Sequence, residues 1–169
     1  MKLHLARIDN LRKLYIDQIQ HLHFAESQIM EALPKMIEVA DDTELKAALQ
    51  THLQETREHA SRLEQILQEA IHKLESKKDK AISAIISEGE DTIKDASNAA
   101  VRDAAIITAA QRVEHYEIAA YRSVRNFAQI IGEAQQGGLL QQTLDEENHA
   151  DEVLTGISAS ADTRAAKAA

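Results

Sequence analysis

Two glutamates interrupt the apolar stripe of a predicted helix in the Gln-Arg-Val-Glu-His-Tyr-Glu-Ile-Ala-Ala-Tyr run at residues 111–121. Glu114 and Glu117 are three residues apart, and the same helical face continues through Ile107 before them and Tyr121 after them. An ionised carboxylate is rarely buried without a partner, because the loss of its hydration costs several kcal/mol. The spacing therefore predicts a buried pair of acids that helps to bind a cation. The alternative is a pair of surface acids on a helix that buries its other side.

The three other long helices that we predict also carry acids near their middle, and two of them carry histidines. The acids are Glu26, Glu55 and one of the neighbours Glu146 and Glu147, and the histidines are His52, His59 and His149. Five converging carboxylates would bring a charge of about −5 into the core, and two divalent metal ions would balance most of it. Carboxylate oxygens with some imidazole suit iron or manganese. The chain has no cysteine, which excludes thiolate sites such as iron–sulfur clusters.

The helical spacing leaves some of these acids with more than one orientation. Glu147 continues the apolar stripe of its helix, whereas Glu146 would require the neighbouring stripe, and we favour Glu147. Glu26 points inward unless Ala25 takes the inward position. Glu55 lies just beside its stripe, so it is either a metal ligand or an outward partner of an arginine.

The histidines and one tyrosine near these acids also have alternative roles. His52 is either a metal ligand or a core histidine that donates a hydrogen bond to a carboxylate. We expect His59 to orient Glu55 rather than to bind metal directly. His149 is an alternative ligand. Tyr121 is expected to pack in the core with its hydroxyl on one of the site carboxylates.

Hydrophobic periodicity predicts four long helices near residues 8–40, 44–75, 99–131 and 139–156. Short links make antiparallel hairpins of the first and second helices and of the third and fourth. Residues 76–98 form a long crossover that contains a short helix. We therefore predict an all-α, ferritin-like four-helix bundle over residues 1–157 and a flexible C-terminal tail over residues 158–169, which lack large apolar side chains.

The composition limits which partners and which cellular compartment we expect for this protein. Five glycines and one proline in 169 residues favour helices. The net charge of −9 disfavours nucleic acid and anionic membranes as partners, since both bind through basic patches. No apolar run has the length of a signal peptide or a membrane span, and the lack of cysteine fits a reducing compartment. We expect a cytoplasmic protein.

The sequence resembles the YciF/YciE-like family of ferritin-like bacterial proteins over nearly its whole length. The run at residues 111–121 carries the resemblance together with shorter phrases at residues 25–28, 31–36, 44–47, 52–56, 62–64, 101–105 and 143–147. The resemblance implies a homodimer, a role in stress responses and a centre of two metal ions. It also implies six metal ligands, which are Glu26, His52, Glu55, Glu114, Glu117 and Glu147. The chain departs from the family at His149, where lysine or glutamine is commoner.

Three functions are compatible with these features. The first is a di-iron or di-manganese carboxylate protein that reacts with peroxide or dioxygen, with its two metals about 3.5–4 Å apart. Peroxidase, oxidase and ferroxidase activities all remain open for it. The second is a metal-free helical bundle with a structural or interaction role, in which the buried acids are protonated or hydrogen-bonded. The third is an iron-storage cage, which requires a closed multimeric shell.

Overall fold

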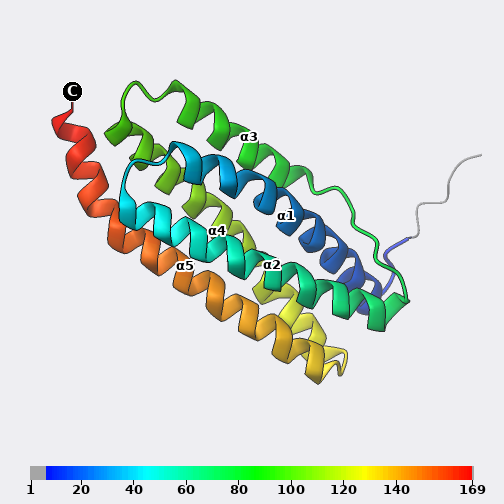
Figure 1. Ribbon diagram of the computed structural model, residues 1–169. Helices are drawn as coiled ribbons and strands as arrows, with labels where there is room; N and C mark the ends of the chain where they lie inside the picture. The colour runs from blue at the N-terminus through cyan, green and yellow to red at the C-terminus, as the bar shows by residue number, and fades with distance from the viewer. Residues whose placement is uncertain (1–6, 169) are drawn as a thin grey trace, which may run out of the picture.

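Five helices make up the structure, a computed structural model that describes residues 7–168 (Figure 1). They are α1 (Leu11–Val39), α2 (Thr43–Ile71), α3 (Lys80–Asp95), α4 (Ala99–Ile130) and α5 (Ala134–Lys167). No strand occurs in the described residues, which confirms the all-α prediction. The predicted long helices correspond to α1, α2, α4 and α5, and the helix expected in the crossover is α3, with 16 residues. None of the helices within residues 7–168 has a stretch long and apolar enough to span a bilayer.

Side-chain caps fix where four of the helices begin. In each case a side-chain oxygen just before the first turn accepts a hydrogen bond from a backbone N–H group that has no partner within the helix. The capping residues are Asn10, Asp42, Asp79 and Asn98. These caps define the breaks before α1, α2, α3 and α4, and so determine where the chain can turn.

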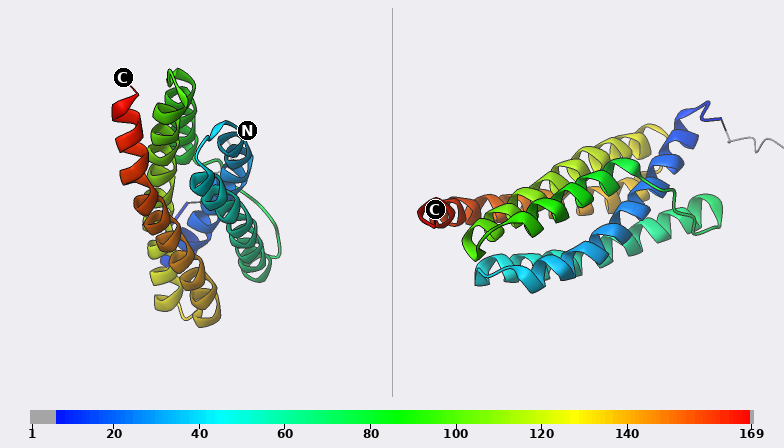
Figure 2. Two further views of the ribbon diagram at one scale, coloured as in Figure 1. Left: turned by 60° about the vertical axis from the view of Figure 1, so that its left-hand side comes forward. Right: turned by 90° about the horizontal axis from the view of Figure 1, so that it is seen from above.

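The long helices form two antiparallel hairpins, α1 with α2 and α4 with α5, which Figure 2 shows as two layers. Across the layers, α1 contacts α4 and α2 contacts α5. The shorter helix α3 lies against α4 and α1. It approaches α4 closely, because a Cβ atom on Gly89 would lie only 2.9 Å from the Cβ of Ala109. The four long helices thus enclose a shared interior.

Two apolar clusters fill this interior, and a band of buried polar residues separates them. On α1, Leu22 belongs to one cluster and Ile29 to the other. On α2, Leu63 belongs to the cluster of Leu22, and Leu49 belongs to the cluster of Ile29. The buried polar and charged residues that lie between these positions in the sequence are Glu26, His52, Thr56 and His59. The apolar clusters therefore shield the polar band from water on both sides.

The C-terminal end of the chain differs from the prediction. The last helix does not end near Gly156 but continues to Lys167, and Ala161 within it is fully buried. Arg164 Nη2 also lies 2.7 Å from Asp42 Oδ2, at the turn between α1 and α2. Residues 158–167, where we predicted a flexible tail, are helical, because alanine favours helix and can pack without a large side chain. Residues 1–6 of the predicted domain and residue 169 of the tail lie outside the described residues.

Asp103 of α4 is a buried acid that holds the turn between α1 and α2. Its two carboxyl oxygens accept hydrogen bonds from the backbone N–H groups of Asp41, at 2.8 Å, and Asp42, at 3.0 Å. We expect Asp103→Ala to lower the free energy of unfolding by ~3 kcal/mol, since two backbone N–H groups in a partly buried turn lose their charged acceptor. Urea denaturation measures this loss. Asp103→Asn keeps one acceptor and should lose less, and equal stability of the alanine variant and the wild type would contradict the assignment.

Candidate metal centre

Six titratable side chains meet in the polar band, and all four long helices contribute to them. They are Glu26 on α1, His52 and His59 on α2, Glu114 and Glu117 on α4, and Glu147 on α5. None of the six is more than 6% exposed. The inward orientation predicted for Glu114 and Glu117 is confirmed, and the alternative of a surface pair is wrong. We call these six residues the acid–histidine cluster.

The cluster contains two overlapping groups of possible metal ligands. The atoms within each group lie within 4.8 Å of one another, and the groups are His52, Glu114, Glu117 and Glu147, and Glu26, His59 and Glu147. Glu147 belongs to both groups and has two oxygens, so it can serve both. Carboxylate oxygen with one imidazole nitrogen in each group is a donor set that suits iron or manganese. The cluster can therefore hold a metal ion.

Both histidines connect helices within the cluster. His52 Nε2 lies 3.2 Å from Glu114 Oε1, which joins α2 to α4. His59 Nδ1 lies 3.0 Å from Glu147 Oε1 and 3.6 Å from Glu26 Oε1, which joins α2 to α5 and α1. Each imidazole is thus within reach of a cation that the neighbouring carboxylates would bind.

Most of the polar atoms in the cluster have no hydrogen-bond partner. Eleven buried side-chain nitrogen and oxygen atoms of the described residues lack one, and nine of the eleven belong to the acid–histidine cluster. Both oxygens of Glu117 and both oxygens of Glu147 are among the nine. Leaving a buried polar atom unpaired costs about 1–3 kcal/mol, and more for a charged group. A bound cation would satisfy these oxygens and nitrogens together, so the residues present fit a metal ion.

Burial shifts the acids of the cluster toward their protonated form. It raises the pKa of Glu26 to about 7 and the pKa of Glu147 to about 8. It also raises the pKa values of Glu114 and Glu117 well above the ordinary range, and repulsion from neighbouring carboxylates adds to the shift. Without a cation, the cluster therefore holds several protons at neutral pH.

These shifts predict that the metal-free protein loses stability as the pH rises. The folded state binds more protons than the unfolded state between the unfolded pKa, near 4.5, and the raised values of about 7 and about 8. We expect the free energy of unfolding to fall between pH 5 and pH 8, by on the order of 3 kcal/mol for Glu26 alone. Urea denaturation with a chelator present measures the change. Glu147→Gln should show a smaller fall, and a stability that rises over this range would contradict the prediction.

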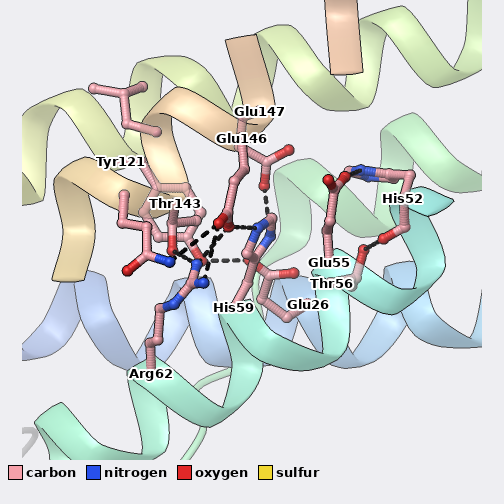
Figure 3. Close-up of polar contacts among 12 residues, drawn as sticks. Glu26, His52, Glu55, Thr56, His59, Arg62, Tyr121, Thr143, Glu146 and Glu147 are labelled. Atoms are coloured by element: carbon pink, nitrogen blue, oxygen red, sulfur yellow. Dashed lines mark hydrogen bonds and ion pairs between the residues drawn. The ribbon is translucent and has the colours of Figure 1, made fainter. Parts of the chain in front are cut away.

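A network at the edge of the cluster orients His59, as Figure 3 shows. Glu146 Oε2 accepts a hydrogen bond of 2.5 Å from Arg62 Nη1 and lies 2.9 Å from His59 Nε2. With Nε2 hydrogen-bonded to Glu146, the Nδ1 atom of His59 faces Glu26 and Glu147. Burial also lowers the pKa of His59, which favours the neutral ring that can bind metal. The geometry therefore supports our preference for Glu147 over Glu146 as the inward acid.

Glu55 and His149 lie outside both groups of ligand atoms. Glu55 is beside His52 on α2, with Oε2 at 3.9 Å from His52 Nδ1 and a side chain that is 28% exposed (Figure 3). His149 is exposed. The predicted role of His59 in orienting Glu55 is wrong, because the carboxylates that His59 contacts are Glu26, Glu146 and Glu147. The predicted alternative, an ion pair of Glu55 with an arginine, is not found among the described residues, and the nearby Arg62 binds Glu146 instead.

Tyr121 is fully buried, and its hydroxyl donates a hydrogen bond to Glu26 Oε1. This confirms the predicted contact with a site carboxylate.

The pairing of Arg62 with Glu146 could not be predicted from the sequence. The two residues are 84 positions apart on different helices, and no local pattern connects them.

Comparison with known proteins shows close relatives along nearly the whole chain. Residues 10–167 match the family model described as "Domain of unknown function (DUF892)". The chain is 34% identical over 149 residues to Protein YciF of Escherichia coli strain K12, and the match covers 88% of this chain and 90% of that protein. The crystal structure of the E. coli stress protein YciF has a TM-score of 0.87 at 31% identity, and covers 92% of this chain and 99% of its own.

Two further solved structures share the fold. YcfI from Rhodopseudomonas palustris, described only provisionally as a structural protein, has a TM-score of 0.87 and 34% identity, covering 89% of this chain and 96% of its own. A protein from Xanthomonas campestris has a TM-score of 0.74 at 17% identity, covering 91% of this chain and 94% of its own. At that low identity the second likeness concerns the fold alone.

Proposed function

We propose a di-metal function for this chain, which belongs to the DUF892 family. Each of the two groups of ligand atoms would hold one divalent ion, iron or manganese, and Glu147 would contact both. The observation that carries the proposal is the set of nine unpartnered polar atoms buried between two apolar clusters. None of the nine atoms has a hydrogen-bond partner among the described residues, although the histidine nitrogens lie close to carboxylate oxygens. Two cations would satisfy these atoms together.

We further propose that α1, α2, α4 and α5 form a ferritin-like four-helix bundle, to which α3 is an addition. Each of these four helices contacts two of the others, and each contributes a residue to the acid–histidine cluster. Converging carboxylates and histidines from facing helices are the way such bundles hold two metal ions.

When bound, a pair of iron or manganese ions would supply two electrons for the reduction of peroxide or dioxygen. The residues of the chain prepare the site for this chemistry. The carboxylates of Glu26, Glu114, Glu117 and Glu147 carry the negative charge that balances two divalent cations, and the apolar clusters on either side exclude water. The Tyr121 hydroxyl places a proton beside Glu26 Oε1. The description of the E. coli relative as a stress protein supports a role in a bacterial stress response, and we propose that this role is cytoplasmic.

Anaerobic loading with ferrous iron or manganese tests the proposal. We expect two ions per chain after desalting, counted by elemental analysis, and consumption of peroxide by the loaded protein. The double variant Glu114→Ala, Glu117→Ala should retain at most one ion, because the first group of ligands loses two of its four members. Unchanged stoichiometry in the variant, or a wild type that retains no metal, would rule the proposal out.

A metal-free structural or interaction role is the second candidate. The provisional description of the R. palustris relative favours it, and so does burial, which keeps the acids protonated near neutral pH. A metal-free role predicts that no metal is retained.

We propose a homodimer for the metal protein, and light scattering distinguishes it from the closed shell that an iron-storage cage would need. The dimer should have twice the 18.8 kDa mass of one chain.

A further inference from the structure

A cavity of about 210 Å³ lies between α2 and α5 beside the acid–histidine cluster. Ala48 of α2 and Ala150 of α5 both line it, and their short side chains leave the space between the two helices open. Buried Leu49 and Leu154 line its interior, while His149 at the lining is exposed to solvent. The cavity is thus an apolar recess that is accessible from the surface.

One end of the cavity is polar, because it shares residues with the cluster. His52 and Glu114 belong both to the lining and to the first group of ligand atoms. Both side chains are more than nine-tenths buried, and His52 Nδ1, His52 Nε2 and Glu114 Oε2 have no hydrogen-bond partner. Figure 3 shows Glu55 next to His52 at this end. A bound molecule would therefore meet hydrogen-bonding groups at one end and mainly apolar side chains elsewhere.

The size of the cavity narrows the class of molecule that fits. An apolar cavity of about 150 Å³ in a protein interior binds benzene. The cavity of about 210 Å³ therefore has room for one ring with one or two small substituents. Peroxide and dioxygen are much smaller and would leave most of the apolar lining without a contact.

We propose that this cavity binds a small, mainly apolar organic molecule with a single hydroxyl group, such as a substituted phenol. The ring lies against Leu49, Leu154 and the two alanines, and the hydroxyl lies at His52 and Glu114. Binding in the cavity does not require metal. Only the role of the molecule as a substrate rests on the proposed metal function, since His52 and Glu114 also belong to the first group of ligand atoms.

Titration of the metal-free protein with 4-methylphenol tests the inference directly. We expect binding with a dissociation constant on the order of 1 mM or tighter, measured by nuclear magnetic resonance of the backbone amides. The shifted amides should lie in residues 48–55, in residues 149–154 and beside Glu114, which surround the cavity. Toluene, which lacks the hydroxyl, should bind about fivefold more weakly, as expected for the loss of one hydrogen bond. Shifts elsewhere in the chain, or equal affinity for toluene, would overturn the assignment.

A variant whose cavity is filled by larger side chains tests the inference in a second way. Ala48→Leu with Ala150→Leu should weaken 4-methylphenol binding by at least ~10-fold, because leucine occupies the space of the ring and also favours helix. Ala119→Leu changes an exposed alanine of α4 away from the cavity and should bind as the wild type does. Circular dichroism checks that both variants keep their helices. Unchanged affinity in the filled variant would overturn the inference.

Cobalt(II) titration of the same samples separates this inference from the proposed metal function. Cobalt bound by a wild type that does not bind 4-methylphenol would reject the organic substrate and leave the metal centre standing. Binding of 4-methylphenol by a chain that takes up no cobalt would establish the cavity as a ligand site and reject the metal centre. In the filled variant, cobalt uptake should remain at the wild-type level, since no ligand atom is changed.

Discussion

Glu147→Gln is expected to abolish the retention of both metal ions. Glu147 is fully buried and is the residue common to the two groups of ligand atoms. The substitution removes the negative charge that the two groups share and replaces one of the two carboxylate oxygens by an amide nitrogen, so Glu147 could no longer offer an anionic oxygen to both groups. Because loss of a residue that only supports a ligand already costs 10–100-fold in metal affinity, we expect more than ~100-fold for this ligand. Elemental analysis after desalting and calorimetric titration measure the loss.

Glu146→Gln is the matched control, since it makes the same chemical change at the next position. Glu146 lies at the edge of the cluster, where it binds Arg62 and His59 Nε2. Its replacement should leave two ions per chain and weaken the ion beside His59 by ~10-fold, the low end of the range for a residue that orients a ligand, because glutamine keeps one oxygen that can accept a hydrogen bond. Two ions retained by Glu147→Gln, or equal losses in both variants, would show that Glu147 is not the shared ligand.

Loading with metal is expected to raise the Tm by on the order of 15 °C or more at pH 8. A ligand that binds only the folded state stabilises it, by about 4 kcal/mol per site at a free concentration 1,000 times the Kd. In a domain of this size each kcal/mol raises the Tm by about 2–4 °C. The relief of the buried, unpartnered carboxyl groups is part of this binding free energy, which is why we expect the stabilisation to exceed that of a surface site.

The same experiment at pH 6 should give a smaller rise. The ions must displace protons from carboxyl groups such as Glu26, whose pKa is about 7, and Glu147, whose pKa is about 8. Differential scanning calorimetry with and without a chelator at both pH values measures the effect. A Tm that metal does not change at pH 8, or a larger rise at pH 6, would count against a buried carboxylate site.

Residues of the acid–histidine cluster could be predicted from the sequence where the spacing of apolar residues within one helix was sufficient. Glu114 and Glu117 are flanked on their own face by apolar residues such as Ile107 and Tyr121, so their burial follows from spacing alone. The same reasoning gave the approximate extents of α1, α2 and α4 and the inward side of Glu26.

Contacts between helices could not be predicted in the same way. The partners of His59 depend on how α2 faces α5, and Glu146 rather than Glu55 is within its reach. The predicted end of α5 was wrong for a related reason. Ala161 is buried by packing against other elements, and Arg164 is held by Asp42, more than a hundred residues earlier in the chain. Neither interaction leaves a periodic pattern of large apolar residues in the local sequence.

The distribution of ligands over the two hairpins has a consequence for how the loaded protein resists degradation. Glu26, His52 and His59 come from the α1–α2 hairpin, whereas Glu114, Glu117 and Glu147 come from α4 and α5. Both groups of ligands include residues from each half, so metal would cross-link the halves twice. The two hairpins could then separate only after the coordination bonds had broken. The loaded chain would consequently open slowly and survive proteases for longer, a kinetic protection distinct from its thermal stability.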